Sequence, residues 1–258
     1  MSQPTSQMYL TALPEFPLVE PGDDLATLIQ ASLTRGAIVL EDGDLLVVAQ
    51  KVVSKAENRY AYLNHVTVGD RAKKLALEVD KDPRLVQLIL DQSCGIVATR
   101  RGVLIVEHNL GYVHANAGID QSNITSDECN PRVLLLPENP DLSADNLSSK
   151  LKSSTLSHLA IIINDSAGRA WRNGSAGFAI GTSGFVALKS MIGNRDLFGR
   201  EMQVTEVAIA DELAAAASFL MGQAGEAAPV ILIRGANLTP SCDGSSAMIR
   251  ARDQDLFR

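Results

Sequence analysis

The stretch LAIIINDSAGRAWRNG, residues 159–174, joins a run of aliphatic residues to a group of polar ones. Residues 159–163 have the length and the β-branched content of a buried strand. Asn164, Asp165 and Ser166 follow directly, so the predicted strand ends in a carboxylate and a hydroxyl. These are the hard oxygen ligands that Mg²⁺ and Mn²⁺ prefer. Alternatively, Asp-Ser-Ala-Gly is a turn in which Asp165 or Ser166 caps the next element.

Two arginines, Arg169 and Arg172, stand just beyond these polar residues. A guanidinium group binds carboxylates and phosphates through forked, charge-assisted hydrogen bonds. We therefore expect Arg169 and Arg172 to contact an anionic substrate.

A second predicted strand also leads to a carboxylate. Residues 103–106 and 112–115 are expected to form a β-hairpin around the turn at residues 109–111. This hairpin leads into a loop that contains Asp120, Ser122 and Asn123. Asp120 and Asp165 would together supply the carboxylates that a nucleotide-bound divalent ion needs. An Asx-turn is again the alternative.

A third group of polar residues follows the predicted buried strand at residues 45–49. Gln50, Lys51, Ser54 and Lys55 come directly after it. Lysines at such a position are often only solvated, but a pair at the end of a buried strand can also meet phosphate as point charges. Both interpretations are left open.

The composition of the 258-residue chain, 46% hydrophobic and 21% charged, is that of a folded protein with a sizeable core. The net charge of −7 gives no support to nucleic-acid binding, and no apolar run approaches the roughly 18–20 residues that span a bilayer. Three distant cysteines and a polar N-terminal sequence indicate a reducing, cytoplasmic setting. The four histidines are scattered and show no zinc-binding spacing.

The pattern along the chain predicts a mixed α/β (α+β) fold. Helices are expected at residues 25–33, at 70–92 with a break near Pro83, and at 205–221, and a further strand at 230–233. We expect residues 1–12 to be a flexible leader, residues 13–235 one functional unit, and residues 236–258 a polar tail. The chain has neither a P-loop nor a Gly-x-Gly-x-x-Gly fingerprint, so the fold is not of the P-loop or Rossmann type.

Six stretches, in this order, resemble the coenzyme F-420-0:L-glutamate ligases, the gamma-glutamyl ligases of deazaflavin coenzyme biosynthesis. They are FPLVEPGDDL (16–25), LEDGDLLVVAQKVVSKAEN (40–58), RGVLIVEHNLGYVHANAGIDQSN (101–123), LLPENPD (135–141), INDSAGRAWRNG (163–174) and FGREMQVTEVAIADELAAAASFLMGQAGE (198–226). Together they cover most of residues 13–235. The chain departs from the family at Gly225, where members usually have an aspartate.

The resemblance implies a GTP-dependent ligase with an unusual two-lobed fold of mixed sheets, which works as a homodimer with Mg²⁺ or Mn²⁺ (two ions) and K⁺. Asp120 and Asp165 would bind the divalent metal, Ser166 and Gln223 would complete its shell, and Lys55 would add a fixed positive charge. The resemblance makes Lys55, Asp120 and Asp165 the catalytic residues. It also implies a set of guanine-nucleotide contacts: Phe16, Pro17, Leu18, Val19, Gln50, Lys51, Lys55, Asn123, Met221, Gly222, Gln223 and Glu226.

The implied reaction fits the carboxylates and lysines found above. An acceptor carboxylate attacks the γ-phosphate of GTP, and the amine of L-glutamate then displaces phosphate from the acyl phosphate. Three alternatives stay open: the same chemistry on a folate-like or furan-type acceptor, a metal-dependent nucleotide phosphohydrolase, and a nucleotide-binding module without catalysis.

Overall fold

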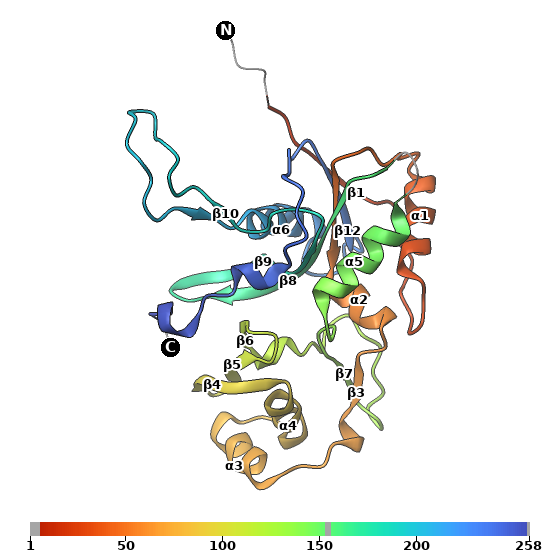
Figure 1. Cartoon of the computed structure of the whole chain (residues 1–258). Coiled ribbons are helices and arrows are strands. Elements are labelled where there is room, and N and C mark those ends of the chain that lie inside the picture. The colour runs from red at the N-terminus through yellow and green to blue at the C-terminus, as the bar shows by residue number, and fades with distance from the viewer. Residues whose placement is uncertain (1–5, 153–155, 257–258) are drawn as a thin grey trace.

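The computed structural model describes residues 6–152 and 156–256, which form two lobes (Figure 1). The larger lobe is built on a five-stranded sheet with the order β1-β12-β2-β8-β9. Its strands are β1 (Tyr9–Ala12), β12 (Val230–Arg234), β2 (Asp44–Ala49), β8 (Leu159–Arg169) and β9 (Arg172–Ser183). Only β2 and β8 pair in parallel, and the other neighbours are antiparallel. The mixed α/β class predicted from the sequence is confirmed.

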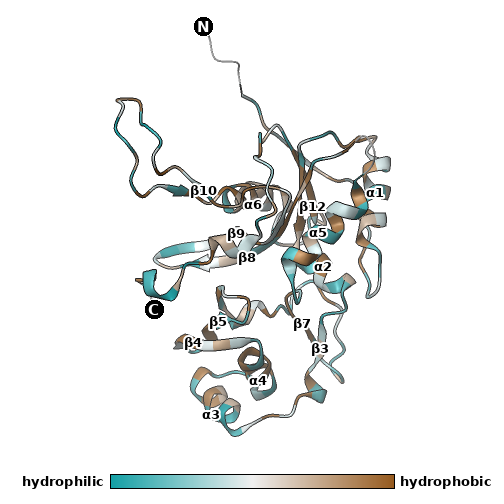
Figure 2. Ribbon diagram, viewed as in Figure 1, coloured by the Kyte–Doolittle hydropathy of each residue, from teal (hydrophilic) through white to brown (hydrophobic). Residues whose placement is uncertain are grey.

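Helices cover both faces of this sheet, which explains why its central strands are continuously apolar. On one face lie α1 (Leu25–Arg35), α2 (Gln50–Ala56) and α5 (Pro140–Leu151), which contribute to a core with alternate residues of the strands. On the other face, α6 (Ile209–Met221) packs its small residues against β9 and β12. Figure 2 shows apolar residues concentrated in these central strands and helices.

The smaller lobe has a hydrophobic core of its own. It contains the pair β3 (Tyr60–Tyr62) and β7 (Arg132–Leu134), the three-stranded sheet β4 (Ser93–Arg100), β5 (Val103–His108) and β6 (Val113–Ala115), and the helices α3 (Asp70–Val79) and α4 (Pro83–Asp91). The break near Pro83 is confirmed, because the Asp82 side chain accepts a hydrogen bond from the Arg84 amide and caps α4. The hairpin of β5 and β6 is confirmed as well.

The prediction that the strand ends at Asn164 was wrong. Strand β8 continues through Asp165 and Ser166 to Arg169, and its register with β9 shifts between Ile163 and Asn164. The neighbouring strand β9 supplies backbone hydrogen-bond partners for these polar residues, so they stay in the ladder and form no turn. The register shift, a β-bulge, re-aims the side chains at the place where the buried strand becomes polar.

The two predicted ends of the chain also need correction. Residues 9–12, which were expected in a flexible leader, form strand β1 and pair with β12. The predicted polar tail is packed as well: Met248 and Ile249 lie against the two cores of the larger lobe, and Arg252 forms an ion pair with Glu107 of β5. These segments lack a helical or strand period over any length, so their burial depends on what they meet in space.

The predicted helix at 205–221 is shorter in the structure. Residues Glu206–Val207 form strand β11, which pairs with β10 (Lys189–Ser190) at the base of a projecting arm, and α6 begins only at Ile209. Among the described residues, no helix is both long enough and apolar enough to span a bilayer.

Gly181 in β9 provides a test of the close packing between the sheet and α5. A Cβ atom at this position would lie 2.5 Å from the carbonyl carbon and oxygen of Pro140, at the start of α5. Gly181→Ala should therefore lower the free energy of unfolding by about 1–3 kcal/mol, because backbone cannot yield as a flexible side chain does. Chemical denaturation measures this, with Gly168→Ala as the control, since nothing lies within 4 Å of a Cβ there. Equal stability of both variants would contradict the prediction.

Candidate active site

A cleft of about 590 Å³ opens where the pairing of β2 with β8 ends, at Ala49 and Asn164. It is lined from one side by residues that follow β2 and by the polar part of β8, and from the other by the loop after β6. The structure brings into this cleft every residue that the sequence predicted as a nucleotide contact, a metal ligand or a catalytic group: Phe16, Pro17, Leu18, Val19, Gln50, Lys51, Lys55, Asp120, Asn123, Asp165, Ser166, Met221, Gly222, Gln223 and Glu226.

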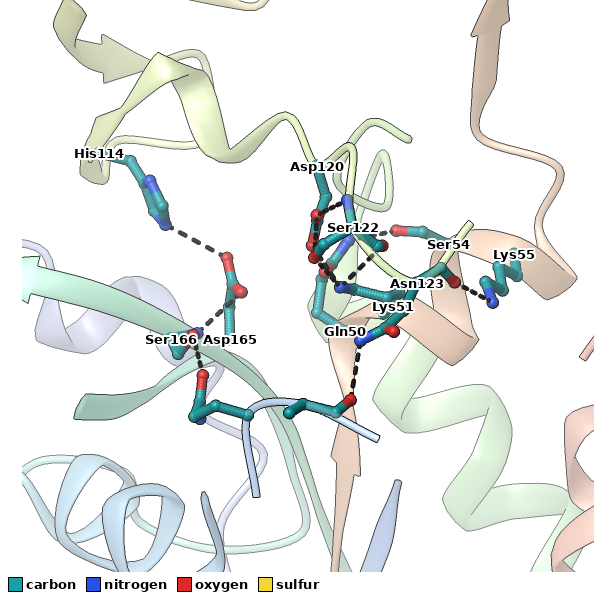
Figure 3. A network of polar contacts seen from close by, with 12 residues as sticks. Gln50, Lys51, Ser54, Lys55, His114, Asp120, Ser122, Asn123, Asp165 and Ser166 are labelled. Atoms are coloured by element: carbon teal, nitrogen blue, oxygen red, sulfur yellow. Dashed lines mark hydrogen bonds and ion pairs between the residues drawn. The ribbon is translucent and has the colours of Figure 1, made fainter. Parts of the chain in front are cut away.

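Lys51 and Asp120 join the two lobes across the cleft (Figure 3). Lys51 stands in the first turn of α2, and its Nζ lies 2.6 Å from Asp120 Oδ2 and donates hydrogen bonds to the carbonyl and hydroxyl of Ser122. Ser122 in turn donates from its amide and its hydroxyl to Asp120 Oδ1. Burial raises the pKa of the Asp120 carboxyl, but the bonds from Lys51 and Ser122 outweigh burial, so the pKa lies below its usual value.

Lys55, one helical turn after Lys51, holds the same loop. Its Nζ donates to the carbonyl of Asn123 at 2.8 Å, and the Asn123 side chain donates to the carbonyl of Ala224 at 3.0 Å. The chain after α6 is thereby tied to the loop after β6. Burial, followed by the positive charge of Lys51, lowers the pKa of the Lys55 ammonium group.

Asp165 lies between the two lobes on strand β8 (Figure 3). One carboxylate oxygen, Oδ2, lies 3.2 Å from Nε2 of His114 in β6, and the other accepts the Ser166 amide at 2.8 Å. The Ser166 hydroxyl donates to Gln223 Oε1 at 3.0 Å. The predicted ligand set Asp165, Ser166 and Gln223 is thus contiguous, and it continues into the chain after α6.

Sequence reasoning missed His114, which was set aside as a scattered histidine. Its Nδ1 lies 2.9 Å from the carbonyl of Ala115, its ring packs on Phe178, and only 9% of its side chain is exposed. Alternation along β6 could have signalled this, because His114 stands between two more exposed neighbours on a half-buried strand. Arg132, Tyr60 and Asn164 also line the cleft and were not predicted.

Arg169 and Arg172, by contrast, lie outside the cleft. They pair with each other at the end of the hairpin of β8 and β9, where both are exposed. Neither is among the cleft-lining residues. The positions of Arg169 and Arg172 outside the cleft therefore do not support their predicted role as substrate contacts.

The oxygen donors in the cleft fit a hard divalent ion. Asp120, Asp165, Ser166 and Gln223 offer carboxylate, hydroxyl and amide oxygens, the ligands that Mg²⁺ and Mn²⁺ prefer. The Oδ1 atom of Asn164 is buried against Gly177 beneath α6, without a hydrogen-bond partner among the described residues, so it does not belong to this donor set. The described part of the chain contains no cluster of three or more His, Cys, Asp or Glu side chains that could hold a metal. Ser and Gln oxygens would have to share the coordination.

Comparison with known proteins identifies the family. Residues 14–235 match the family model described as F420-0:Gamma-glutamyl ligase. The chain belongs to the F420-0:gamma-glutamyl ligase family. It is 41% identical over 244 residues to the coenzyme F420:L-glutamate ligase of Methanothermobacter thermautotrophicus. The aligned residues cover 94% of this chain and 95% of that protein.

Two other relatives of this ligase family agree. The coenzyme F420:L-glutamate ligase of Methanocaldococcus jannaschii is 42% identical over 219 residues, 85% of this chain and 86% of its own. That of Archaeoglobus fulgidus is 40% identical over 243 residues, 94% of this chain and 93% of its own. The chain is therefore an enzyme of the ligase class, and the F420 gamma-glutamyl ligase family predicted from its motifs is confirmed.

The contact between His114 and Asp165 can be tested by titration of this ligase without metal or nucleotide. Burial lowers the pKa of His114, but the Asp165 carboxylate and the Ala115 carbonyl outweigh burial and raise it above 6.5. In Asp165→Asn only burial and the carbonyl remain, so the pKa should fall. NMR of the imidazole resonances measures both values. Burial, followed by the charge of His114, lowers the pKa of His108 to about 4, so this second buried histidine should change much less than His114.

The same contact has a consequence for stability. Because the folded-state pKa of His114 is raised, its contribution to the free energy of unfolding is complete below the unfolded value of about 6.5. The contribution is lost as the pH rises through the folded-state pKa. An unfolding free energy with the same pH dependence in wild type and Asp165→Asn would contradict the ion pair.

Proposed function

We propose that the chain is a GTP-dependent ligase that joins L-glutamate to coenzyme F420-0 through an acyl phosphate. The observation that carries this proposal is the convergence of Lys51, Lys55, Asp120 and Asp165 on one cleft at the edge of the sheet. The printed names of the relatives, coenzyme F420:L-glutamate ligase, support L-glutamate and the deazaflavin acceptor as substrates.

In the proposed reaction, the acceptor carboxylate attacks the γ-phosphorus of GTP and GDP leaves. The amine of L-glutamate then attacks the acyl carbon, phosphate leaves, and the amine loses a proton as the amide forms. The residues act mainly by position and charge, since phosphoryl transfer needs no protein nucleophile. Lys55 presents a half-buried positive charge, and Lys51 orients the Asp120 carboxylate.

We propose that Asp120, Asp165, Ser166 and Gln223 hold the divalent ions, two of Mg²⁺ or Mn²⁺, and that K⁺ assists. When bound, such ions neutralise the charge that develops on transferring phosphoryl oxygens. The chain of hydrogen bonds that joins Asp165, Ser166 and Gln223 supports a shared ligand site in this part of the cleft. The proposal for K⁺ rests on the family resemblance alone.

One reaction tests the proposed function directly. The enzyme is incubated with GTP, Mn²⁺, K⁺, L-glutamate and F420-0, and the products are weighed by mass spectrometry. We expect a product heavier by one or more glutamyl units, reduced about 100-fold or more in Asp165→Ala. Asp70→Ala, which removes an exposed carboxylate at the start of α3 in the smaller lobe, is the control and should retain activity.

Other outcomes separate the alternatives. Phosphate release from GTP without L-glutamate would indicate a phosphohydrolase. If GTP is bound and F420-0 is not extended, folate-like and furan-type acceptors should be offered next. Failure to bind GTP and to extend any of these acceptors would contradict the proposal.

We further propose that the enzyme is a homodimer held in part by the arm between β10 and β11. Figure 1 shows this arm projecting from the larger lobe. Its large apolar side chains are exposed, which is unusual for a solvated loop: Ile192, Leu197, Phe198 and Val204. A second copy of the chain is the partner that the family resemblance implies.

The arm provides a prediction for assembly. The double variant Leu197→Ser/Phe198→Ser should shift the protein from dimer to monomer, since both side chains are more than four-fifths exposed in one chain and would be buried only by a partner. Size-exclusion chromatography with light scattering measures the mass. Leu77→Ser, an equally exposed leucine on α3, is the control. A wild-type monomer would contradict the dimer.

A further inference from the structure

Arg132 occupies a defined place in the cleft that the reaction outlined above does not use. It begins β7, and its guanidinium carbon lies 3.9 Å from the centroid of the Tyr60 ring on the paired strand β3. Its Nε donates to the carbonyl of Thr125 at 2.6 Å. Arg132, Tyr60 and Thr125 all line the cleft. The plane of the guanidinium group is therefore set by stacking on one ring and by one hydrogen bond.

The hydrogen bond to Thr125 leaves the two terminal nitrogens of Arg132 for a ligand. In the part of the chain that the structure describes, no carboxylate forms an ion pair with Arg132 and neither terminal nitrogen donates a hydrogen bond to the protein. Other half-buried arginines have acidic partners: Arg59 pairs with Glu138, and Arg234 pairs with Asp44. Arg132 is thus held in place but not neutralised.

Positive charge is gathered at this end of the cleft. Three cations line it: Lys51, Lys55 and Arg132. Burial, followed by the charge of Lys51, lowers the pKa of Lys55, and Arg132 adds to this effect, while the carboxylates of Glu20 and Asp120 oppose it. Like charges brought together in a partly buried site are unfavourable unless an anion joins them. Lys51 is paired with Asp120 at 2.6 Å, whereas neither Lys55 nor Arg132 forms an ion pair among the described residues. A bound anion would offset the repulsion.

We infer that Arg132, stacked on Tyr60, is an anchor for an oxyanion of a substrate in this cleft. The inference rests on the proposed ligase function, in which the substrates carry two kinds of oxyanion: the phosphates of GTP and the carboxylates of L-glutamate and the acceptor. A planar guanidinium with two terminal nitrogens matches either one through a forked pair of charge-assisted hydrogen bonds. It takes the role that the sequence suggested for Arg169 and Arg172, which lie outside the cleft.

Binding measured without turnover tests the anchor. Calorimetry gives the Kd of a non-hydrolysable GTP analogue, and initial rates at saturating GTP and acceptor give KM for L-glutamate. We expect Arg132→Gln to weaken one of these by about 10- to 100-fold, the range for a lost hydrogen bond to a charged partner. Arg132→Lys, which keeps the charge and loses the fork, should recover only part of the loss.

Two further variants separate the anchor from a general effect of charge or folding. Tyr60→Leu keeps Arg132 and removes its platform, and should weaken the same ligand by about 2- to 5-fold. Arg172→Gln, at the exposed end of the hairpin, removes one positive charge outside the cleft and should leave both constants unchanged. Thermal unfolding of each variant checks that the fold is retained.

The outcomes for Arg132→Gln identify the source of the oxyanion. A weaker GTP analogue with unchanged KM for L-glutamate assigns the anchor to phosphate, and the reverse assigns it to the α- or γ-carboxylate of glutamate. A change in the KM for the acceptor alone, measured at saturating GTP and L-glutamate, assigns it to the acceptor. If the folded variant matches Arg172→Gln in nucleotide Kd and in KM for L-glutamate and for the acceptor, the inference is wrong. A wild-type enzyme that binds the analogue but forms no glutamyl product would overturn the proposed function. The Kd of the GTP analogue for Arg132→Gln would still show whether Arg132 binds phosphate.

Discussion

The parallel pairing of β2 with β8 is the constraint on which the site depends. Their register aligns Ala49 with Asn164, so the residues that follow β2 and the polar half of β8 emerge at one edge of the sheet. Lys51 and Asp165, more than a hundred residues apart in sequence, thereby line one cleft. The apolar strands before them are buried on both faces, and a one-residue slip would reverse the direction of every side chain. The core of the larger lobe thus holds the polar groups in position.

The smaller lobe completes the site through charged contacts, beside an apolar contact in which Tyr112 packs into the core of the larger lobe and against Phe178. Asp120 meets Lys51, the loop at Asn123 meets Lys55, and His114 meets Asp165. The first two contacts are made by residues that line the cleft, so the charges of a bound substrate would compete with them. In partly buried surroundings these interactions are stronger than they would be in water, and an unpaired member is costly. Arg132 is the one cleft cation described here with a fixed plane and no acidic partner.

Local pattern was sufficient where a segment's own residues settle its structure. Asp82 and Pro83 start α4 in the place predicted, and the hairpin around residues 109–111 follows from turn chemistry. The local sequence pattern failed to predict the structure of segments whose conformation or burial depends on a partner distant in sequence. Strand β8 runs past Asp165 because β9 supplies its hydrogen bonds, residues 9–12 form a strand because β12 offers an edge, and Met248 and Ile249 are buried by cores that no local period reveals.

The sequence by itself determined the family, the mixed α/β class and most of the residues that meet in the cleft, because ordered motifs are local properties of the chain. Only the tertiary structure decided which arginine faces the cleft, since Arg169 and Arg172 are carried outward by the length of a hairpin that pairing alone sets. It also decided that His114 touches Asp165 and that Arg132 stacks on Tyr60. The first contact depends on the relative position of the two lobes and the second on the pairing of β3 with β7, and no spacing within one segment encodes either.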